Sequence, residues 1–400
     1  MGARSFVVVG GGIVGLALAR QLLEAYPGSV TTVVEKEDRV AAHQSGHNSG
    51  VVHAGVYYGP GSLKARLCSR GRAQLREACQ EWGVAYEEAG KLIVARDDAE
   101  LAALHNLHDR ATANGVPGLR RLGPDGIREI EPNVKGVAAL HSPQTAIVDF
   151  ARVAEAIADD VRRRGGQVLL GAEVTAFRRT NNSVDVVTTK DVLRAGQVVI
   201  CAGLQGDRVA RLAGDTADPA IVPFRGEYYR LAPHCRQAVK GLVYPVPDPR
   251  YPFLGVHFTR RIDGNVDIGP NAVLALAREG YRRSQVEPSD LWATLSWPGT
   301  RRMARRHWRA GAREMRTSLF KSAFLAAARA YVPDLSSQDL LPAPAGVRAQ
   351  AVAADGSLVD DFQVHNLGRL IAVRNAPSPA ATSSLAIAEH LVQMMDGALS

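Results

Sequence analysis

A glycine-rich turn near the start of the sequence constrains the fold more than any other feature. Residues 10–15 (Gly-Gly-Gly-Ile-Val-Gly) follow an apolar, β-branched run at residues 5–9, and they precede a helical stretch that ends near Tyr26. A second apolar run covers residues 29–35. Short apolar runs without alternation are typical of parallel strands buried on both faces. The sequence therefore predicts a strand–helix–strand unit that opens a Rossmann-like sheet.

Three glycines of this turn have roles in a dinucleotide-binding site. Gly10 permits the tight turn, Gly12 lets the backbone approach a pyrophosphate, and Gly15 lets the helix pack close to the strand. The helix N-terminus offers N–H groups and the positive end of its dipole to phosphates. Glu35, at the end of the second run, is placed to accept hydrogen bonds from ribose hydroxyls. The alternative is a plain turn with a surface glutamate.

Three loops of small or polar residues favour FAD over NAD. Residues 43–50 (His-Gln-Ser-Gly-His-Asn-Ser-Gly) follow Glu35 closely and provide a polar path along a long cofactor. Residues 171–174 precede a buried strand at 196–203. Residues 375–382 (Asn-Ala-Pro-Ser-Pro-Ala-Ala-Thr) join a late strand to the last helix, whose N-terminus would stabilise negative charge on a reduced isoalloxazine ring. Ordinary turn chemistry is the alternative for each loop.

The rest of the chain divides into two kinds of segment. We expect helices at 69–82, 97–114 and 383–395, and strands at 167–170, 184–188 (around the Asn181-Asn182 turn) and 370–373. Residues 222–335 are rich in Tyr, Pro and Arg, with strand-like pieces followed by a basic helical stretch at 291–330. We predict an α/β (α+β two-domain) fold: a Rossmann-like FAD-binding domain at 1–82, 140–221 and 340–400, and a second domain at 83–139 and 222–339.

Composition narrows the function further. The formal net charge of +8 indicates an anionic partner, but aromatic residues are 6% of the chain and no basic tract alternates with them, which argues against nucleic acid. None of the four cysteines forms a Cys-x-x-Cys pair, so we expect no metal site and a reducing compartment. The first strand begins within five residues, which leaves no room for a signal peptide. We expect a cytoplasmic protein, with peripheral contact at the inner membrane as an alternative.

Several long segments resemble the FAD-dependent D-amino-acid oxidase superfamily and, within it, the L-2-hydroxyglutarate oxidase/dehydrogenase family. The segments that carry the resemblance are 42–58, 60–68, 90–95, 252–260, 269–272, 342–350, 358–362 and 375–382. The resemblance covers nearly the whole chain. It implies that the second domain is an antiparallel-sheet substrate domain that covers the flavin. It also implies FAD, hydride transfer from L-2-hydroxyglutarate to flavin N5, and formation of 2-oxoglutarate. One departure is Arg374, where the family pattern has an apolar residue.

The resemblance and the loops together predict a set of cofactor contacts. The expected residues are Gly10, Gly12, Ile13, Val14, Gly15, Glu35, Lys36, His43, Gln44, Ser45, His47, Asn48, Ser49, Gly50, Val51, Val174, Cys201, Ala202, Gly203, Arg348, Asn375, Ser378, Pro379, Ala380, Ala381 and Thr382.

Oxidation of a 2-hydroxy acid needs a base for the hydroxyl proton and cations for the carboxylates. Histidine suits the first role near neutral pH, and His257 and His53 are the candidates in the family-like segments. Arginine binds carboxylate through a planar fork, and we favour Arg348 for the α-carboxylate. The alternative is a purely structural role, as a hydrogen-bonded core residue for each histidine or as a surface charge for the arginine. Further substrate contacts are expected from Tyr57, Tyr58, Lys64, Arg66 and Tyr229.

Other functions stay open at this stage. One alternative is an amine, D-amino-acid or other 2-hydroxy-acid oxidase of the same superfamily. A second is glycerol-3-phosphate oxidation, for which we identify no phosphate site. A third, of another class, is a non-catalytic dinucleotide-binding module. The electron acceptor is oxygen, a quinone or an electron-transfer protein. The basic stretch at 301–316 is a solvated helix face or a docking surface for an anionic membrane.

Overall fold

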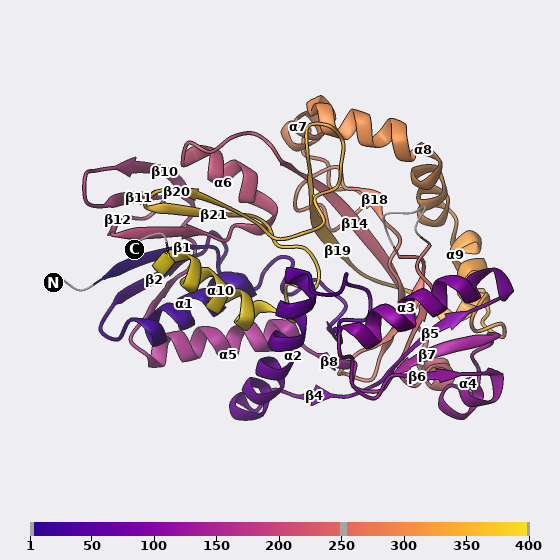
Figure 1. Cartoon of the computed structure of the whole chain (residues 1–400). Helices are drawn as coiled ribbons and strands as arrows, with labels where there is room; N and C mark the ends of the chain where they lie inside the picture. Colours follow the sequence, from indigo (N-terminus) through magenta and orange to yellow (C-terminus); the bar gives the residue numbers. More distant parts are fainter. Residues whose placement is uncertain (1–3, 249–253, 398–400) are drawn as a thin grey trace.

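The computed structural model describes residues 4–248 and 254–397 of the chain (Figure 1). Pro252 and Phe253, which open one family-like segment, lie outside the described residues, as do the first three and last three residues of the predicted FAD-binding domain. The fold is a mixed α/β architecture with several sheets, as predicted.

The expected strand–helix–strand unit opens a six-stranded sheet. Its strands run in the order β20-β21-β13-β1-β2-β9, and β1 pairs in parallel with both β2 and β13. Their bounds are β1 Ser5–Val9, β2 Val30–Val34, β9 Gln167–Leu169, β13 Gln197–Ile200, β20 Gln363–Leu367 and β21 Leu370–Asn375. The parallel strands place their carboxyl ends at one edge of the sheet, where ligands of such folds bind.

Helices cover one face of this sheet and a small sheet covers the other. Apolar side chains of β1 and of four helices form one core cluster. The helices are α1 Ile13–Ala25, α2 Leu63–Trp82, α5 Phe150–Arg163 and α10 Ser384–Gly397. On the other face, a second cluster joins the sheet to strands β10 Val174–Arg179, β11 Val184–Thr188 and β12 Val192–Ala195 and to helix α6 Gly206–Leu212. A short third sheet contains β3 Val51–Val52, β4 Tyr86–Glu87 and β8 Ala146–Val148.

A nine-stranded sheet forms the second half of the molecule. The strand order is β18-β14-β17-β16-β15-β5-β7-β6, and β19 pairs with β14 in addition. The bounds are β5 Lys91–Ala95, β6 Arg120–Leu122, β7 Ala138–Ser142, β14 Ala220–Leu231, β15 Leu242–Pro245, β16 His257–Arg260, β17 Val266–Gly269, β18 Val273–Leu274 and β19 Leu340–Val352. Helices α3 Leu101–Ala113, α4 Pro124–Ile130, α7 Pro288–Ser296, α8 Pro298–Leu319 and α9 Lys321–Arg329 surround it (Figure 1).

Two sequence-based assignments need correction. Helix α2 begins six residues earlier than expected, at Leu63, because the Ser62 hydroxyl caps it by accepting a hydrogen bond from the Ala65 N–H group. The hairpin around Asn181-Asn182 joins β10 to β11, whereas residues 167–169 pair with β2 in the six-stranded sheet. The predicted domain boundaries stay a prediction.

Candidate functional site

One cavity of about 1070 Å³ runs between the two large sheets. It is lined by the carboxyl ends of β1, β2 and β13, by the loop after β21, and by residues of β14, β16 and β19. Most of the predicted cofactor contacts line it: Gly10, Gly12, Ile13, Val14, Glu35, Lys36, His43, Gln44, Ser45, His47, Asn48, Ser49, Val51, Val174, Cys201, Ala202, Gly203, Arg348, Asn375, Ser378, Pro379, Ala380, Ala381 and Thr382. The sequence segments chosen for FAD therefore converge on one space.

The glycine turn has the shape that a pyrophosphate requires. Gly10 has a φ of +115°, and a Cβ there would lie 2.4 Å from the Cys201 carbonyl oxygen. A Cβ on Gly15 would lie 2.1 Å from the Gly10 carbonyl oxygen, so Gly15 serves helix–strand packing and is outside the cavity lining. At Gly12 the nearest atom to such a Cβ is the Ser45 Oγ at 3.4 Å, and Gly12 borders the cavity.

These three environments give a direct prediction. Gly15→Ala is expected to yield a destabilised protein without bound flavin, because its Cβ overlaps backbone that cannot move aside. Gly12→Ala is expected to keep the melting temperature of the apoprotein but to weaken FAD binding, because the methyl group fills the side of the turn that faces the cavity. Thermal unfolding and flavin content of both purified variants check this. Equal flavin content in Gly12→Ala and the parent would contradict the proposed pyrophosphate position.

Glu35 lies where ribose hydroxyls would be bound. Its Oε2 accepts a hydrogen bond of 2.7 Å from the Gly11 N–H group, and its Oε1 accepts one of 2.9 Å from the Glu37 N–H group. A carboxylate oxygen accepts more than one hydrogen bond, so both atoms keep capacity for a ligand. The buried carboxylate is thus fixed at the mouth of the glycine turn.

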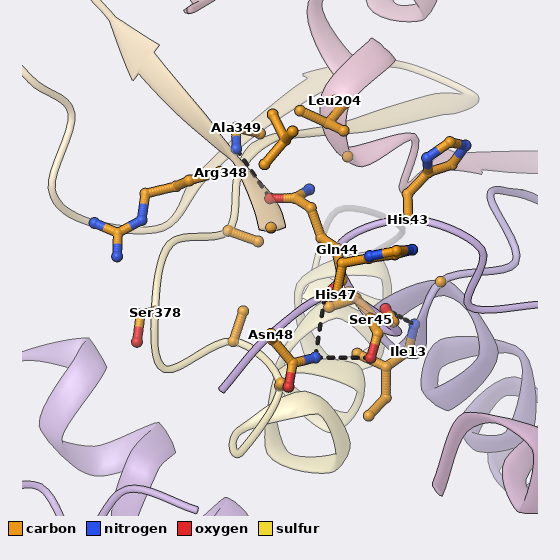
Figure 2. A pocket seen from close by; sticks show the side chains of 18 of the residues that line it. Ile13, His43, Gln44, Ser45, His47, Asn48, Leu204, Arg348, Ala349 and Ser378 are labelled. Carbon is orange, nitrogen blue, oxygen red and sulfur yellow. Dashed lines mark hydrogen bonds between the residues drawn. The ribbon is translucent and has the colours of Figure 1, made fainter. Parts of the chain in front are cut away.

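The loop after β2 lies between the start of α1 and strand β19 (Figure 2). The Ser45 hydroxyl accepts a hydrogen bond of 2.9 Å from the Ile13 N–H group, and Gln44 Oε1 accepts one of 3.0 Å from the Ala349 N–H group. Asn48 Nδ2 donates to the carbonyls of Gln44 and Ser45. These bonds hold the loop along the cavity wall. Gly50 lies outside the lining, because it packs against the Val148 carbonyl.

A charged cluster beside this loop has spacing that a metal ion could use. Oxygen or nitrogen atoms of Glu37, His43 and Glu279 lie within 4.8 Å of one another. The Lys36 ammonium, however, donates to both carboxylates, at 3.1 Å for Glu279. Because this cation already balances the acidic pair, the cluster is explained as an ion-pair network.

The other end of the cavity holds the predicted catalytic histidines. His257 Nδ1 lies 2.8 Å from the Gly255 carbonyl oxygen, and only a protonated Nδ1 can donate to that oxygen. Nε2 of a neutral His257 therefore carries a lone pair. The backbone N–H group of His53 donates to the Thr382 hydroxyl at 3.1 Å, which fixes His53 to the loop before α10. Its Nδ1 is buried, with no hydrogen-bond partner among the described residues.

Burial and positive charge keep both histidines neutral. Burial lowers the pKa of His257 to about 3; the Gly255 hydrogen bond opposes this effect, and the charges of Lys91 and Arg348 add smaller contributions that lower the pKa further. Burial, and then the charges of Lys91, His257 and Arg348, lower the pKa of His53 well below its ordinary value. A neutral imidazole is the form that accepts a proton.

Tyrosines and cations complete this end. Tyr57, Tyr58, Lys64 and Arg348 line the cavity, and Lys64 Nζ donates to Asp360 at 2.7 Å. Figure 2 shows Arg348 on β19, beside the Gln44–Ala349 contact. Burial lowers the pKa of Arg348 and raises that of Tyr57 well above its ordinary value.

Two predicted substrate contacts lie elsewhere. Arg66 is exposed on α2, and Tyr229 packs edge-on against Phe324 in the second core, with ring centroids 4.8 Å apart. Neither belongs to the cavity lining. Tyr229 points away because side chains alternate along β14, and Tyr228 takes the cavity side.

Sequence reasoning did not select Tyr228, Tyr244 or Lys91. Tyr228 and Tyr244 line the cavity, and the Tyr244 and His257 rings lie 4.0 Å apart. Lys91 is 1% exposed beneath them. A signal was present for Lys91, since it is a charged residue at the start of the apolar run 91–95.

Arg374, the departure from the family pattern, is buried beside the predicted flavin loop. Its guanidinium forms an ion pair with Asp215 and donates to the carbonyls of Thr216 and Pro219. The charge therefore points into an ion pair and away from solvent.

Known proteins are similar in sequence to this chain over nearly its whole length. The chain matches the FAD dependent oxidoreductase (DAO) family over residues 5–394. It is 45% identical over 396 residues to the L-2-hydroxyglutarate dehydrogenase of Escherichia coli K12, covering 99% of this chain and 94% of that protein. It is 46% identical over 398 residues to the mitochondrial L-2-hydroxyglutarate dehydrogenase of Homo sapiens, covering 95% and 86%.

Solved structures show the same fold at low identity. Dithionite-reduced L-α-glycerophosphate oxidase from Mycoplasma pneumoniae, with FAD bound, superposes with a TM-score of 0.79 at 23% identity and covers 99% of this chain and 95% of its own. Glycine oxidase from Geobacillus kaustophilus gives a TM-score of 0.74 at 17% identity, covering 98% and 95%.

Proposed function

The chain belongs to the L-2-hydroxyglutarate dehydrogenases of the FAD-dependent oxidoreductase (DAO) family, and from this premise we propose that it oxidises L-2-hydroxyglutarate to 2-oxoglutarate. The observation that supports this most is the cavity end where a neutral His257 with a fixed tautomer, His53 and Arg348 converge. Bound FAD supplies the hydride acceptor at its N5 position.

Each side chain at this end has a proposed task. His257 Nε2 accepts the proton of the substrate hydroxyl, because its Nδ1 is already committed to Gly255. Arg348 binds the α-carboxylate through its planar guanidinium. His53, fixed to Thr382, offers its unpartnered ring nitrogen to the substrate. The surrounding tyrosine rings exclude water from the reacting carbon.

A panel of substrates distinguishes the oxidation of L-2-hydroxyglutarate from the reactions of related enzymes. With a dye as electron acceptor, the purified protein is expected to oxidise L-2-hydroxyglutarate and to show far lower kcat/KM with the D-isomer, L-lactate, sarcosine and sn-glycerol 3-phosphate. If turnover is fastest with sarcosine or glycerol 3-phosphate, the proposed substrate is wrong, although the assignment to the family stands.

We infer the class of electron acceptor from the surface that helices α7 and α8 expose. No helix in the described parts of the chain is long and apolar enough to cross a bilayer. Helix α8 carries a row of exposed arginines, and large apolar side chains are exposed next to them: Trp292 (75%), Trp308 (63%) and Leu319 (65%). Figure 1 shows α7 and α8 at the outer side of the nine-stranded sheet. Basic and apolar side chains on one helix are typical of peripheral membrane contact.

We expect this surface to bind anionic membranes and to pass electrons to a quinone there. Arg305, Arg306 and Arg309 changed together to Gln should lower vesicle binding about 100-fold, since each cation near an anionic surface contributes about 1 kcal/mol. Co-sedimentation with phosphatidylglycerol-containing vesicles measures this, with a triple Gln variant of the exposed Arg76, Arg128 and Arg152 as control. Binding that is absent, or is equal in both variants, would rule out the docking surface.

A further inference from the structure

Lys91 is a buried cation next to the proposed catalytic histidines. It is 1% exposed at the start of β5, and its Nζ lies 4.3 Å from the ring centre of Tyr244 and 5.2 Å from that of Tyr57. Both tyrosines line the cavity. Lys91 itself is not among the residues that line the cavity, so its ammonium lies directly behind these two rings.

Among residues 4–248 and 254–397, this ammonium has no carboxylate counter-ion. Lys91 Nζ forms no ion pair or hydrogen bond with these residues, and its polar surroundings are the two ring faces, the Cys68 thiol and the imidazoles of His53 and His257. Burial lowers the pKa of Lys91 to about 7. A buried cation without a partner either loses its proton or gains an anionic partner, so a ligand that carries negative charge would stabilise the charged form of Lys91.

Two further polar groups beside Lys91 are unsatisfied in the same way. The Tyr57 hydroxyl and His53 Nδ1 are buried with no hydrogen-bond partner among the described residues. They surround the same space from the segment after β3. A ligand with several acceptor oxygens would satisfy a donor set of this kind.

The positions of Lys91 and Arg348 suit a ligand with two separated carboxylates. Arg348 belongs to β19, beside the loop at Gln44, whereas Lys91 belongs to β5, so the two cations approach the cavity end from different strands. His53 and His257 lie between the two cations and are affected by both charges.

We propose that Lys91 binds the distal carboxylate of the substrate and so selects dicarboxylates over monocarboxylates of the same chain length. This rests on the proposed function, because it assigns the α-carboxylate to Arg348. Tyr57 and Tyr244 hold the ammonium in place through their ring faces. The α-carbon is then fixed from both ends beside the histidines.

The first test compares two ligands of five carbons. 2-Oxoglutarate carries the distal carboxylate and 2-oxovalerate lacks it. Binding to the FAD-loaded protein is followed by the change in the visible flavin spectrum. Lys91→Met is expected to weaken 2-oxoglutarate binding roughly 100-fold, as expected for the loss of one partner of a buried charge pair, with little change for 2-oxovalerate. An equal loss for both ligands would indicate a merely structural role and overturn the proposal.

A matched control removes a lysine that also lies over a tyrosine ring. Lys321 Nζ lies 5.8 Å from the centre of the Tyr229 ring, outside the cavity. Lys321→Met is expected to leave the ratio of the two affinities unchanged. If it changes that ratio as much as Lys91→Met does, the effect is not specific to the cavity.

A second test needs no variant. The titratable groups that face Lys91 are Cys68, His53, His257, Tyr57 and Tyr244, and the charge of Arg348 acts on the same two histidines. A carboxylate next to Lys91 raises its pKa, so near pH 7 the protein should take up more protons with 2-oxoglutarate than with 2-oxovalerate. Calorimetry in two buffers of different ionisation enthalpy measures the difference in proton uptake. Any proton uptake by the histidines that the α-carboxylate causes is the same for both ligands, so it cancels in this difference. Equal uptake overturns the proposal, even where Lys91→Met fails to fold.

These outcomes are separate from failure of the proposed function. A parent protein that does not oxidise L-2-hydroxyglutarate would reject the substrate itself. A parent protein that oxidises it, while Lys91→Met keeps the parent's preference for 2-oxoglutarate, would reject only the role of Lys91.

Discussion

Replacement of His257 by glutamine is expected to lower the rate of flavin reduction by L-2-hydroxyglutarate about 10²- to 10⁴-fold, the usual contribution of a positioned general base. Glutamine retains a polar side chain but has no lone pair of comparable basicity where Nε2 lies. FAD content and melting temperature are expected to stay near those of the parent. Anaerobic stopped-flow absorbance measures the rate.

The comparison with His53→Gln assigns the roles. His53 is proposed to contact the substrate, so its loss should mainly raise KM. His141→Gln is the control, because His141 lies on β7 of the same sheet, next to Arg120 and outside the cavity lining. If His53→Gln abolishes flavin reduction while His257→Gln retains it, the base is His53 and the tautomer argument fails.

Disruption of the ion pair between Arg374 and Asp215 by Arg374→Met should produce a large loss of stability. Their side chains are 0% and 4% exposed, and removal of the guanidinium leaves the buried Asp215 carboxylate with His365 as its remaining ionisable partner. Arg374→Met is therefore expected to lower the free energy of unfolding by about 3–5 kcal/mol. Chemical denaturation measures this. The exposed pair Arg194–Asp185 is the control, and its disruption by Arg194→Met should have little effect.

The same ion pair predicts a pH dependence. Burial would raise the pKa of Asp215, but hydrogen bonds from His365 and Arg374 outweigh it and hold that pKa below its ordinary value. The carboxyl group therefore contributes stability above its unfolded pKa, and this contribution is lost as the pH falls through the lower folded pKa. In Asp215→Asn, the part of the acid-induced loss of stability that comes from this group should disappear. If Asp215→Asn loses as much stability at low pH as the parent does, Asp215 is not the group responsible.

The glycine turn and its flanking strands were predictable from sequence because local rules govern them. The run 5–9, the turn and Glu35 each follow from backbone geometry, and the structure places them together as expected. The loops at 43–50 and 375–382 were found in the same way, from small polar residues next to strands. Family resemblance added the two histidines and Arg348, all of which line the cavity.

Long-range pairing explains what the sequence did not reveal. The partner of β11 was misassigned because the run 167–170 is more apolar than β10, which contains Thr175, Arg178 and Arg179, and only the pairing in the sheets decides between them. Tyr229 was chosen over Tyr228 because the register of β14 decides which of two adjacent tyrosines faces the cavity. Burial of Arg374 depends on Asp215, which is remote in sequence.

Anaerobic mixing of the purified, FAD-loaded protein with L-2-hydroxyglutarate tests the central claim most directly. Flavin absorbance should bleach rapidly with this substrate, and neither D-2-hydroxyglutarate nor L-lactate should bleach it at a comparable rate, with 2-oxoglutarate formed in equal amount to the flavin reduced. A yellow protein whose absorbance does not change on mixing with L-2-hydroxyglutarate would contradict the proposed reaction.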